Sequence, residues 1–103
     1  MFRTIKLDKR YSGYLYFKYR IQFKGDYRTR HENYCQIRKW CWDTFGQSLE
    51  LDLYLKYSKS TFGNIIEPVW CFSYEKQFYT ALIYLKGDKE LSLLSLKWSQ
   101  IEH

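Results

Sequence analysis

Residues 14–45 read YLYFKYRIQFK-GDYRTR-HENYCQIRKWCWDTF, and the hydrophobic period changes between the first and last parts of this stretch. In residues 14–24, apolar and aromatic side chains occupy the odd positions, whereas tyrosine and polar side chains occupy the even positions. A period of two with many aromatic residues predicts a half-buried strand. Gly25 and Asp26 end the pattern, because both residue types favour turns.

A helical period follows over residues 31–45. At about 100° per residue, one narrow sector collects the apolar side chains, and Trp40 and Trp42 fall at its two margins. The sector consists of Tyr34, Ile37, Cys41, Thr44 and Phe45. Gly46 is suited to terminate the helix. We therefore predict a helix with one buried side.

The remaining chain predicts three further strands and one more helix. Leucine alternates with polar residues over residues 49–57, which indicates a strand. Residues 69–74 and 78–85 are rich in β-favouring residues and are expected to form a hairpin. A last helix is expected to begin with Asp88 as its cap, although Leu91-Ser92-Leu93 also fits a strand. Its apolar stripe would comprise Leu91, Leu94 and Trp98.

This order of elements predicts an α+β fold. A strand, a helix and a strand in succession imply a right-handed crossover and a parallel pair. We expect a single mixed sheet with two helices packed on one face, as a two-layer sandwich of ferredoxin-like or related topology. The 103 residues suit a single domain over residues 1–103. Residues 1–13 fit either an extra strand or a mobile basic arm.

The composition is rich in aromatic side chains and unevenly charged. Aromatic residues make up 21% of the chain, and its formal net charge is +6. Residues 1–39 hold 11 Lys and Arg against three acidic residues, so they carry the whole positive excess. Such an excess attracts phosphate backbones or acidic protein surfaces, or serves only as a solubilising surface. We expect no membrane span and no signal peptide, because no long apolar stretch occurs.

Chemical motifs are sparse. The chain holds two histidines, and no Gly-rich phosphate loop is present. Cys35, Cys41 and Cys71 are an odd number without a C-x-x-C pair, which favours reduced thiols over disulfides. Together with His31 they lack the paired spacing of a structural zinc site. We therefore expect a protein that is not an enzyme and has no metal and no cofactor.

The sheet face away from the helices is the expected binding surface. On it, the first strand alternates tyrosine with Lys and Arg, a pattern typical of surfaces that stack and neutralise single-stranded nucleic acid. Alternatively, Glu50 and Asp52 on the neighbouring strand pair with Lys18 and Arg20 as a charge ladder. Trp42 is expected at an interface. The candidate binding surface comprises Tyr14, Tyr16, Lys18, Arg20, Lys24, Arg28, Arg30 and Trp42.

Two segments carry a resemblance to a known group of proteins. Residues 34–46, YCQIRKWCWDTFG, and residues 83–90, IYLKGDKE, with the later Leu96-Lys97-Trp98, resemble short proteins of no established activity from tailed bacteriophages, particularly marine ones. The resemblance carries no catalytic residues over to this chain. It implies a small accessory or virion-associated protein located in the host cytoplasm or in the virion.

Two functional hypotheses follow. The favoured one is a protein–protein interaction module that binds a partner, or a second copy of itself, through an aromatic and basic sheet face or edge. The alternative is a single-stranded nucleic-acid-binding accessory protein that uses the Tyr, Lys and Arg residues of the first strand. The former is favoured because the predicted carboxylates of Glu50 and Asp52 interrupt a continuous phosphate groove.

Overall fold

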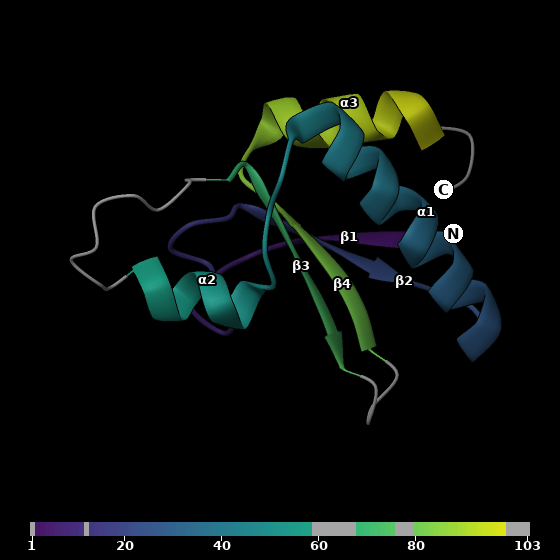
Figure 1. The fold of residues 1–103 in the computed structure, drawn as a ribbon, viewed down its shortest axis with the longest axis horizontal. Helices are drawn as coiled ribbons and strands as arrows, with labels where there is room; N and C mark the ends of the chain where they lie inside the picture. The colour runs from purple at the N-terminus through teal and green to yellow at the C-terminus, as the bar shows by residue number, and fades with distance from the viewer. Residues whose placement is uncertain (1, 12, 59–67, 76–79, 99–103) are drawn as a thin grey trace.

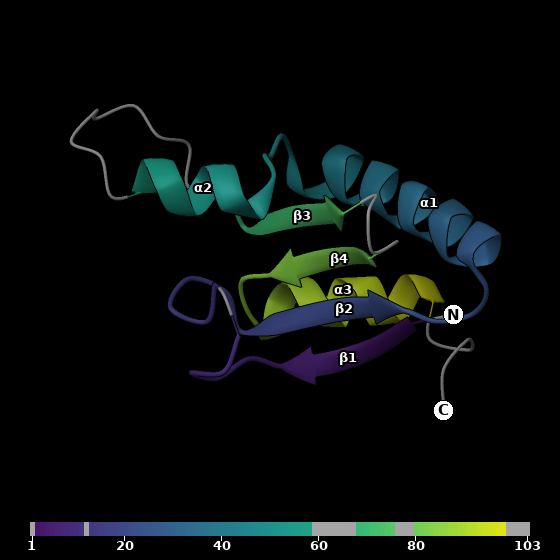
Figure 2. The same ribbon diagram turned by 90° about the horizontal axis from the view of Figure 1, so that it is seen from below.

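The computed structural model of this protein describes residues 2–11, 13–58, 68–75 and 80–98. Four strands form one sheet in the order β1-β2-β4-β3, and each neighbouring pair is antiparallel (Figures 1 and 2). The strands are β1 (Phe2–Lys6), β2 (Tyr19–Phe23), β3 (Trp70–Glu75) and β4 (Thr80–Leu85). The helices are α1 (Tyr27–Phe45), α2 (Leu51–Ser58) and α3 (Asp88–Trp98). The prediction of an α+β fold with a single sheet is confirmed.

One face of the sheet is covered by α1 and α3. Helix α1 lies over β4, with β2 and β3 to its sides, and α3 packs beside it. The Trp40 and Trp98 rings of the two helices meet edge to face, 5.2 Å apart. The buried side chains of this layer are Phe2, Ile21, Phe23, Tyr34, Ile37, Cys41, Trp70, Ala81, Ile83, Leu85, Leu94 and Trp98. The two predicted helices thus lie on one face, as expected.

The opposite face is not free, because a second apolar cluster covers part of it. Helix α2 and the segment between β1 and β2 pack there, and Figure 1 shows α2 on the other side of β3 from α1. The buried members are Leu7, Phe17, Leu51, Tyr54, Cys71, Leu82 and Tyr84. Residues 81–85 of β4 are consequently buried on both faces of the sheet.

The first predicted strand is shorter than expected. Only residues 19–23 pair within the sheet, whereas the amides of Tyr16 and Phe17 both donate to the Gly13 carbonyl at 2.9 Å. Gly13 has a φ of +85°, which a side chain rarely tolerates, so it allows the chain to turn there. The turn buries Phe17 against α2 and leaves Leu15 72% exposed. Leu15 is one of the apolar side chains at odd positions that a half-buried strand over residues 14–24 would turn toward the core, and this expectation was wrong.

The predicted strand over residues 49–57 was also wrong. Glu50 forms one isolated parallel bridge with Phe72, and the chain then enters α2. Leu51 and Tyr54, three residues apart, turn the same side of this helix toward the sheet. All hydrogen-bonded pairs of the described strands are antiparallel, so the sheet is antiparallel rather than mixed. Because β2 and β3 are both antiparallel to β4, they run in the same direction, and the chain crosses from β2 to β3 through α1 and α2, as expected for a ferredoxin-like or related topology.

Helix caps explain two smaller differences. The Asp26 carboxylate accepts a hydrogen bond from the Thr29 amide at 2.8 Å, so α1 begins at residue 27, before the predicted start. At α3, the Glu90 carboxylate accepts from the Gly87 amide at 2.9 Å, whereas the carboxylate of Asp88, the predicted cap, binds Lys18 and Tyr19. Gly46 ends α1 as predicted, with a φ of +97°.

The hairpin of β3 and β4 is confirmed, and so is the buried stripe of α3, in which Leu94 and Trp98 are buried and Leu91 packs against the core. Thr44 is exposed, unlike the rest of its predicted sector. Residues 2–6 form an edge strand whose one neighbour among the described strands is β2. The N-terminal segment was expected to form either an extra strand or a mobile basic arm, and residues 2–6 form the strand.

Replacing Ile83 by Ala should lower the free energy of unfolding by about 2–5 kcal/mol, since it opens a cavity at a site with 0% exposure in the strand that both layers cover. Urea denaturation followed by circular dichroism measures this loss. Ile5→Ala removes the same atoms from half-buried β1 and should cost less than about half as much. Equal losses would contradict the central position of β4.

Candidate functional site

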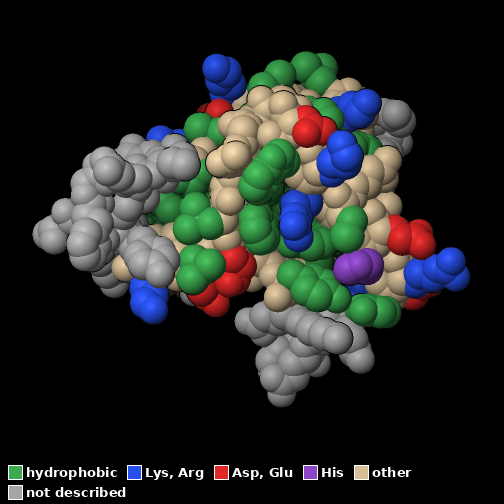
Figure 3. All heavy atoms as spheres, in the orientation of Figure 1, with side chains coloured by type: hydrophobic (Ala, Val, Ile, Leu, Met, Phe, Trp, Pro, Cys, Tyr) green, Lys and Arg blue, Asp and Glu red, His purple; other side chains and the backbone are tan. Residues whose placement is uncertain are grey.

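Among the described residues, one of the two margins of helix α1 is only partly covered. On one side, Trp40 packs against Trp98 and Phe45. On the other side, a row of side chains at intervals of three and four residues faces the edge strand β3. We name this region the α1–β3 surface and define it as Tyr27, His31, Cys35, Arg38 and Trp42 of α1 with Phe72 and Tyr74 of β3. Figure 3 shows hydrophobic side chains interspersed with Lys, Arg and His over this face of the molecule.

An aromatic group lies at the N-terminal end of this surface. The Tyr27 and His31 rings stack with centroids 6.2 Å apart, and His31 lies 5.4 Å from the Tyr74 ring. The hydroxyls of Tyr27 and Tyr74 are 3.3 Å apart. The Tyr74 ring also stacks on buried Tyr34 at 5.7 Å. These contacts link α1 to the edge strand through side chains that are themselves partly exposed.

The same contacts alter the chemistry of the group. The hydrogen bond with the Tyr27 hydroxyl, followed by burial, raises the pKa of Tyr74 to about 12. His31 Nε2 lies 3.6 Å from the Cys35 thiol. Within the described part of the chain, His31 Nδ1 is buried without a hydrogen-bond partner. Tyr74 is therefore a neutral phenol at physiological pH, and the group offers aromatic faces rather than anions.

Arg38 and Trp42 form the other end of the surface. The guanidinium of Arg38 lies 4.6 Å from the centroid of the Phe72 ring and 6.0 Å from that of Tyr34. Burial raises the pKa of Tyr34, and the nearby Arg38 charge opposes this effect. Trp42 is 42% exposed and meets buried Trp70 edge to face at 6.4 Å. A hollow of about 320 Å³ is lined here by Cys35, Arg38, Lys39 and Trp42.

Hydrogen bonds fix the backbone beneath this end. The Trp70 indole N–H donates to the Gly46 carbonyl at 2.8 Å, and the Ser48 hydroxyl donates to the Trp70 carbonyl. The chain that leaves α1 is therefore tied to the first residue of β3. Trp42 and Arg38 are presented by a helix whose end is anchored, rather than by a loop.

The structure disperses the predicted strand residues. Tyr14 is exposed in the turn, and Tyr16 packs on Tyr54 at 5.3 Å. Lys18 forms an ion pair with Asp88 at 3.0 Å. Arg20 lies on the other side of β2 from Tyr19, with its guanidinium 4.6 Å from the Tyr11 ring centroid.

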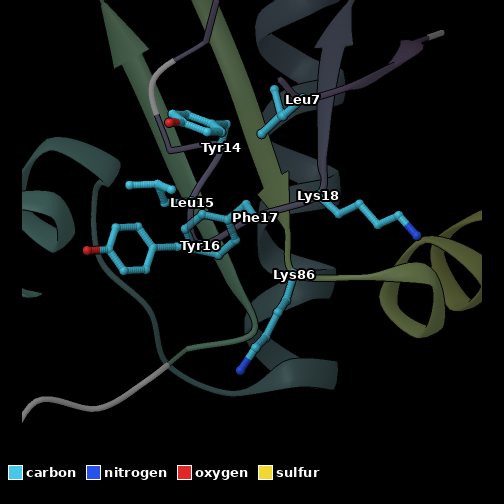
Figure 4. Close-up of a pocket in the computed structure, with 7 residues that line it drawn as sticks. All are labelled: Leu7, Tyr14, Leu15, Tyr16, Phe17, Lys18 and Lys86. Atoms are coloured by element: carbon cyan, nitrogen blue, oxygen red, sulfur yellow. The ribbon is translucent and has the colours of Figure 1, made fainter. Parts of the chain in front are cut away.

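A second hollow, of about 250 Å³, adjoins the turn. Figure 4 shows Tyr14, Leu15 and Tyr16 at one side of it, while Lys18 reaches away toward α3 and Lys86 extends in a different direction. The Lys18 ammonium and the Tyr19 hydroxyl both bind the Asp88 carboxylate, and these bonds lower the pKa of Asp88. The aromatic and basic residues of this region therefore do not form one continuous row.

The other predicted residues are also separated. Lys24 and Arg28 are exposed near the start of α1, and Arg28 pairs with Glu32 at 3.2 Å. Arg30 is half-buried. Trp42 is the one predicted site residue that belongs to the α1–β3 surface. Glu50 and Asp52 precede and begin α2 instead of lying on a strand beside Lys18 and Arg20, so the predicted ladder is not formed.

Sequence reasoning missed most of the α1–β3 surface. Tyr27 lay before the predicted helix, and His31, Cys35 and Arg38 were not grouped with Trp42. The spacing of residues 27, 31, 35, 38 and 42 was the available signal, since it keeps five side chains on one helical face. The contributions of Phe72 and Tyr74 depend on strand order and could not be read from spacing.

No group of three His, Cys, Asp or Glu side chains that could hold a metal ion occurs among the described residues. Within the same residues, no helix is both long enough and apolar enough to cross a membrane. No protein-family model matches the chain, and no curated protein or solved structure is similar to it. The candidate site therefore depends on geometry alone.

One thiol should react rapidly in the native protein. Burial raises the pKa of Cys41 to about 12 and that of Cys71 to about 11, whereas Cys35 is exposed. Because the thiolate is the nucleophile, DTNB at pH 8 should titrate one group per chain quickly and all three after denaturation. Cys35→Ser should remove the fast phase. A fast phase that survives this substitution would contradict the burial of Cys41 and Cys71.

Proposed function

We propose that this protein is a protein–protein interaction module that binds its partner through the α1–β3 surface. The observation that carries the proposal is the pairing of Trp42, 42% exposed, with Arg38 beside a hollow of about 320 Å³. Trp, Tyr and Arg are the residue types that contribute most binding energy at protein interfaces. Here they occur together on one helical face.

Rigidity supports the proposal. The Trp42 ring rests on Trp70, and the Arg38 guanidinium rests on the Phe72 ring. Side chains already held in place lose less conformational entropy when a partner binds. The α1–β3 surface is thus organised before binding, which favours recognition of a folded or helical partner site without large rearrangement.

The resemblance to short phage proteins suits the same proposal. A small accessory or virion-associated protein acts by binding another phage or host component, and a second copy of the chain is also a possible partner class. In each case the interaction module needs an exposed anchor such as Trp42, and no catalytic group.

Site-directed photo-cross-linking tests the proposal. A photoreactive amino acid at Lys39, which lines the hollow, should capture a discrete partner in the cells that produce the protein. The same group at Lys89, exposed on α3, is the matched control and should capture none. Adding Trp42→Ala should reduce the Lys39 product at least about tenfold, because it removes the anchor.

Equal cross-linking yields at Lys39 and Lys89 would overturn the proposal. So would a yield at Lys39 that Trp42→Ala does not reduce. Sedimentation velocity over a range of protein concentrations separates a second copy from a foreign partner. A product composed of two chains, together with concentration-dependent mass, assigns the surface to self-association.

Nucleic-acid binding through β2 is the alternative, and the dispersed positions of Tyr14, Tyr16, Lys18 and Arg20 argue against it. We expect labelled single-stranded DNA to bind weakly at ~50 mM salt, and Lys18→Glu with Arg20→Glu to change this affinity by less than about twofold. Fluorescence anisotropy at ~50 and ~200 mM salt measures it. Tight binding that falls steeply with salt and is lost in the double variant would restore the alternative.

A further inference from the structure

Resting on the proposed function, we infer the chemistry of the partner: an acidic segment that inserts one bulky apolar side chain beside Trp42 and places a carboxylate on Arg38. The hollow defines the first half of this inference. Its volume of about 320 Å³ is at the lower end of the range for small-ligand sites, so it accommodates one or two side chains. Trp42 supplies an aromatic wall against which an apolar side chain can be desolvated.

The position of Arg38 defines the second half. Its guanidinium carbon lies over the Phe72 ring, 4.6 Å from the ring centroid, and the side chain is exposed. The guanidinium has five N–H donors, so an exposed Arg38 can form a bidentate bond to a carboxylate. No carboxylate of the described chain lies within ion-pair distance of Arg38.

The surrounding charge favours an acidic partner. Lys39 also lines the hollow, and its ion pair with Asp43 joins two exposed side chains that are 79% and 61% accessible. An exposed pair of this kind contributes little to stability and can exchange partners. The positive excess of residues 1–39 extends the attraction beyond direct contact.

A nucleic acid fits these observations less well. Backbone recognition uses cations distributed along a groove, so that successive phosphates are neutralised. At the hollow, the two cations Arg38 and Lys39 adjoin one apolar space rather than a groove. A partner segment with one bulky apolar side chain and adjacent carboxylates matches this arrangement.

Fluorescein-labelled peptides provide the test. The acidic probe is a twelve-residue peptide, a length of about three helical turns, with a central Trp flanked by Asp and Glu. Its matched probes replace Asp and Glu by Asn and Gln, or the central Trp by Ala. By anisotropy, the acidic Trp probe should bind at least about tenfold more tightly than either matched probe, since each lacks one half of the recognition.

Variants of the protein locate this binding. Arg38→Ala and Trp42→Ala should each weaken the acidic probe at least about tenfold, while Arg38→Lys should recover only part of the loss. Arg3→Ala removes the same charge from an exposed position of β1 outside the hollow and should change affinity less than about twofold. The bound probe should also slow the reaction of Cys35 with DTNB, because Cys35 lines the hollow.

Several outcomes overturn the inference. These are equal affinity for the acidic and amide probes, equal losses from Arg3→Ala and Arg38→Ala, and unchanged Cys35 reactivity in the presence of saturating probe. Tighter binding of an oligothymidylate through Arg38 would assign the site to nucleic acid. If cross-linking at Lys39 yields a partner while the acidic probe fails, the partner chemistry is wrong and the interaction surface stands.

Discussion

The burial of β4 on both faces is the constraint on which the rest of the structure depends. Residues 81–85 alternate between the two apolar layers, with Ile83 directed to one and Tyr84 to the other. Neither layer can be left open, because each would expose several large apolar side chains to water. Helices α1 and α3 cover one face of β4, and α2 with the turn before β2 covers the other.

This arrangement also explains why α1 has an exposed margin. A helix packed on a sheet buries one stripe and leaves two flanks. Helix α3 covers the flank that carries Trp40. The other flank lies over the edge strand β3, where Phe72 and Tyr74 partly cover it and Trp42 stays exposed. The candidate interaction surface is therefore a product of the same packing that makes the core.

The confirmed elements were predicted on different grounds. Helix α1 rested on a helical period and the β3–β4 hairpin on β-favouring composition, whereas α3 rested on a cap and an apolar stripe although Leu91-Ser92-Leu93 also fitted a strand. Helix α1, the β3–β4 hairpin and α3 fall within a few residues of the prediction. The alternating leucines of residues 49–57 led to a wrong prediction of a strand. The same short run also fits a helix, in which Leu51 and Tyr54, three residues apart, both face the core. The continuous apolar run of residues 81–85 was the stronger clue, because a strand with that pattern is buried on both faces.

At the candidate site, the sequence could place a residue on one face of its own helix, but it could not show which residues of a distant strand lie beside it. Trp42 was expected at an interface because helical spacing alone places it on a shoulder of the buried stripe. Its neighbours Phe72 and Tyr74 come from a distant strand, and only the antiparallel register sets them beside α1. Of the basic residues of the predicted strand, Arg20 alone lies in β2, whereas Lys18 precedes it and pairs with Asp88. Tyr14 and Tyr16 lie in the turn that follows Gly13, so the predicted row is not continuous.

The edge strand β1 has a further consequence, which concerns aggregation. Among the described strands it has one neighbour, so its outer backbone groups could in principle template another chain. Exposed Arg3 and Lys6 occupy two of its five positions and disfavour such growth, because charges on an edge strand repel an added strand. The charges of Arg3 and Lys6 thus oppose the growth of fibrils along the outer side of β1.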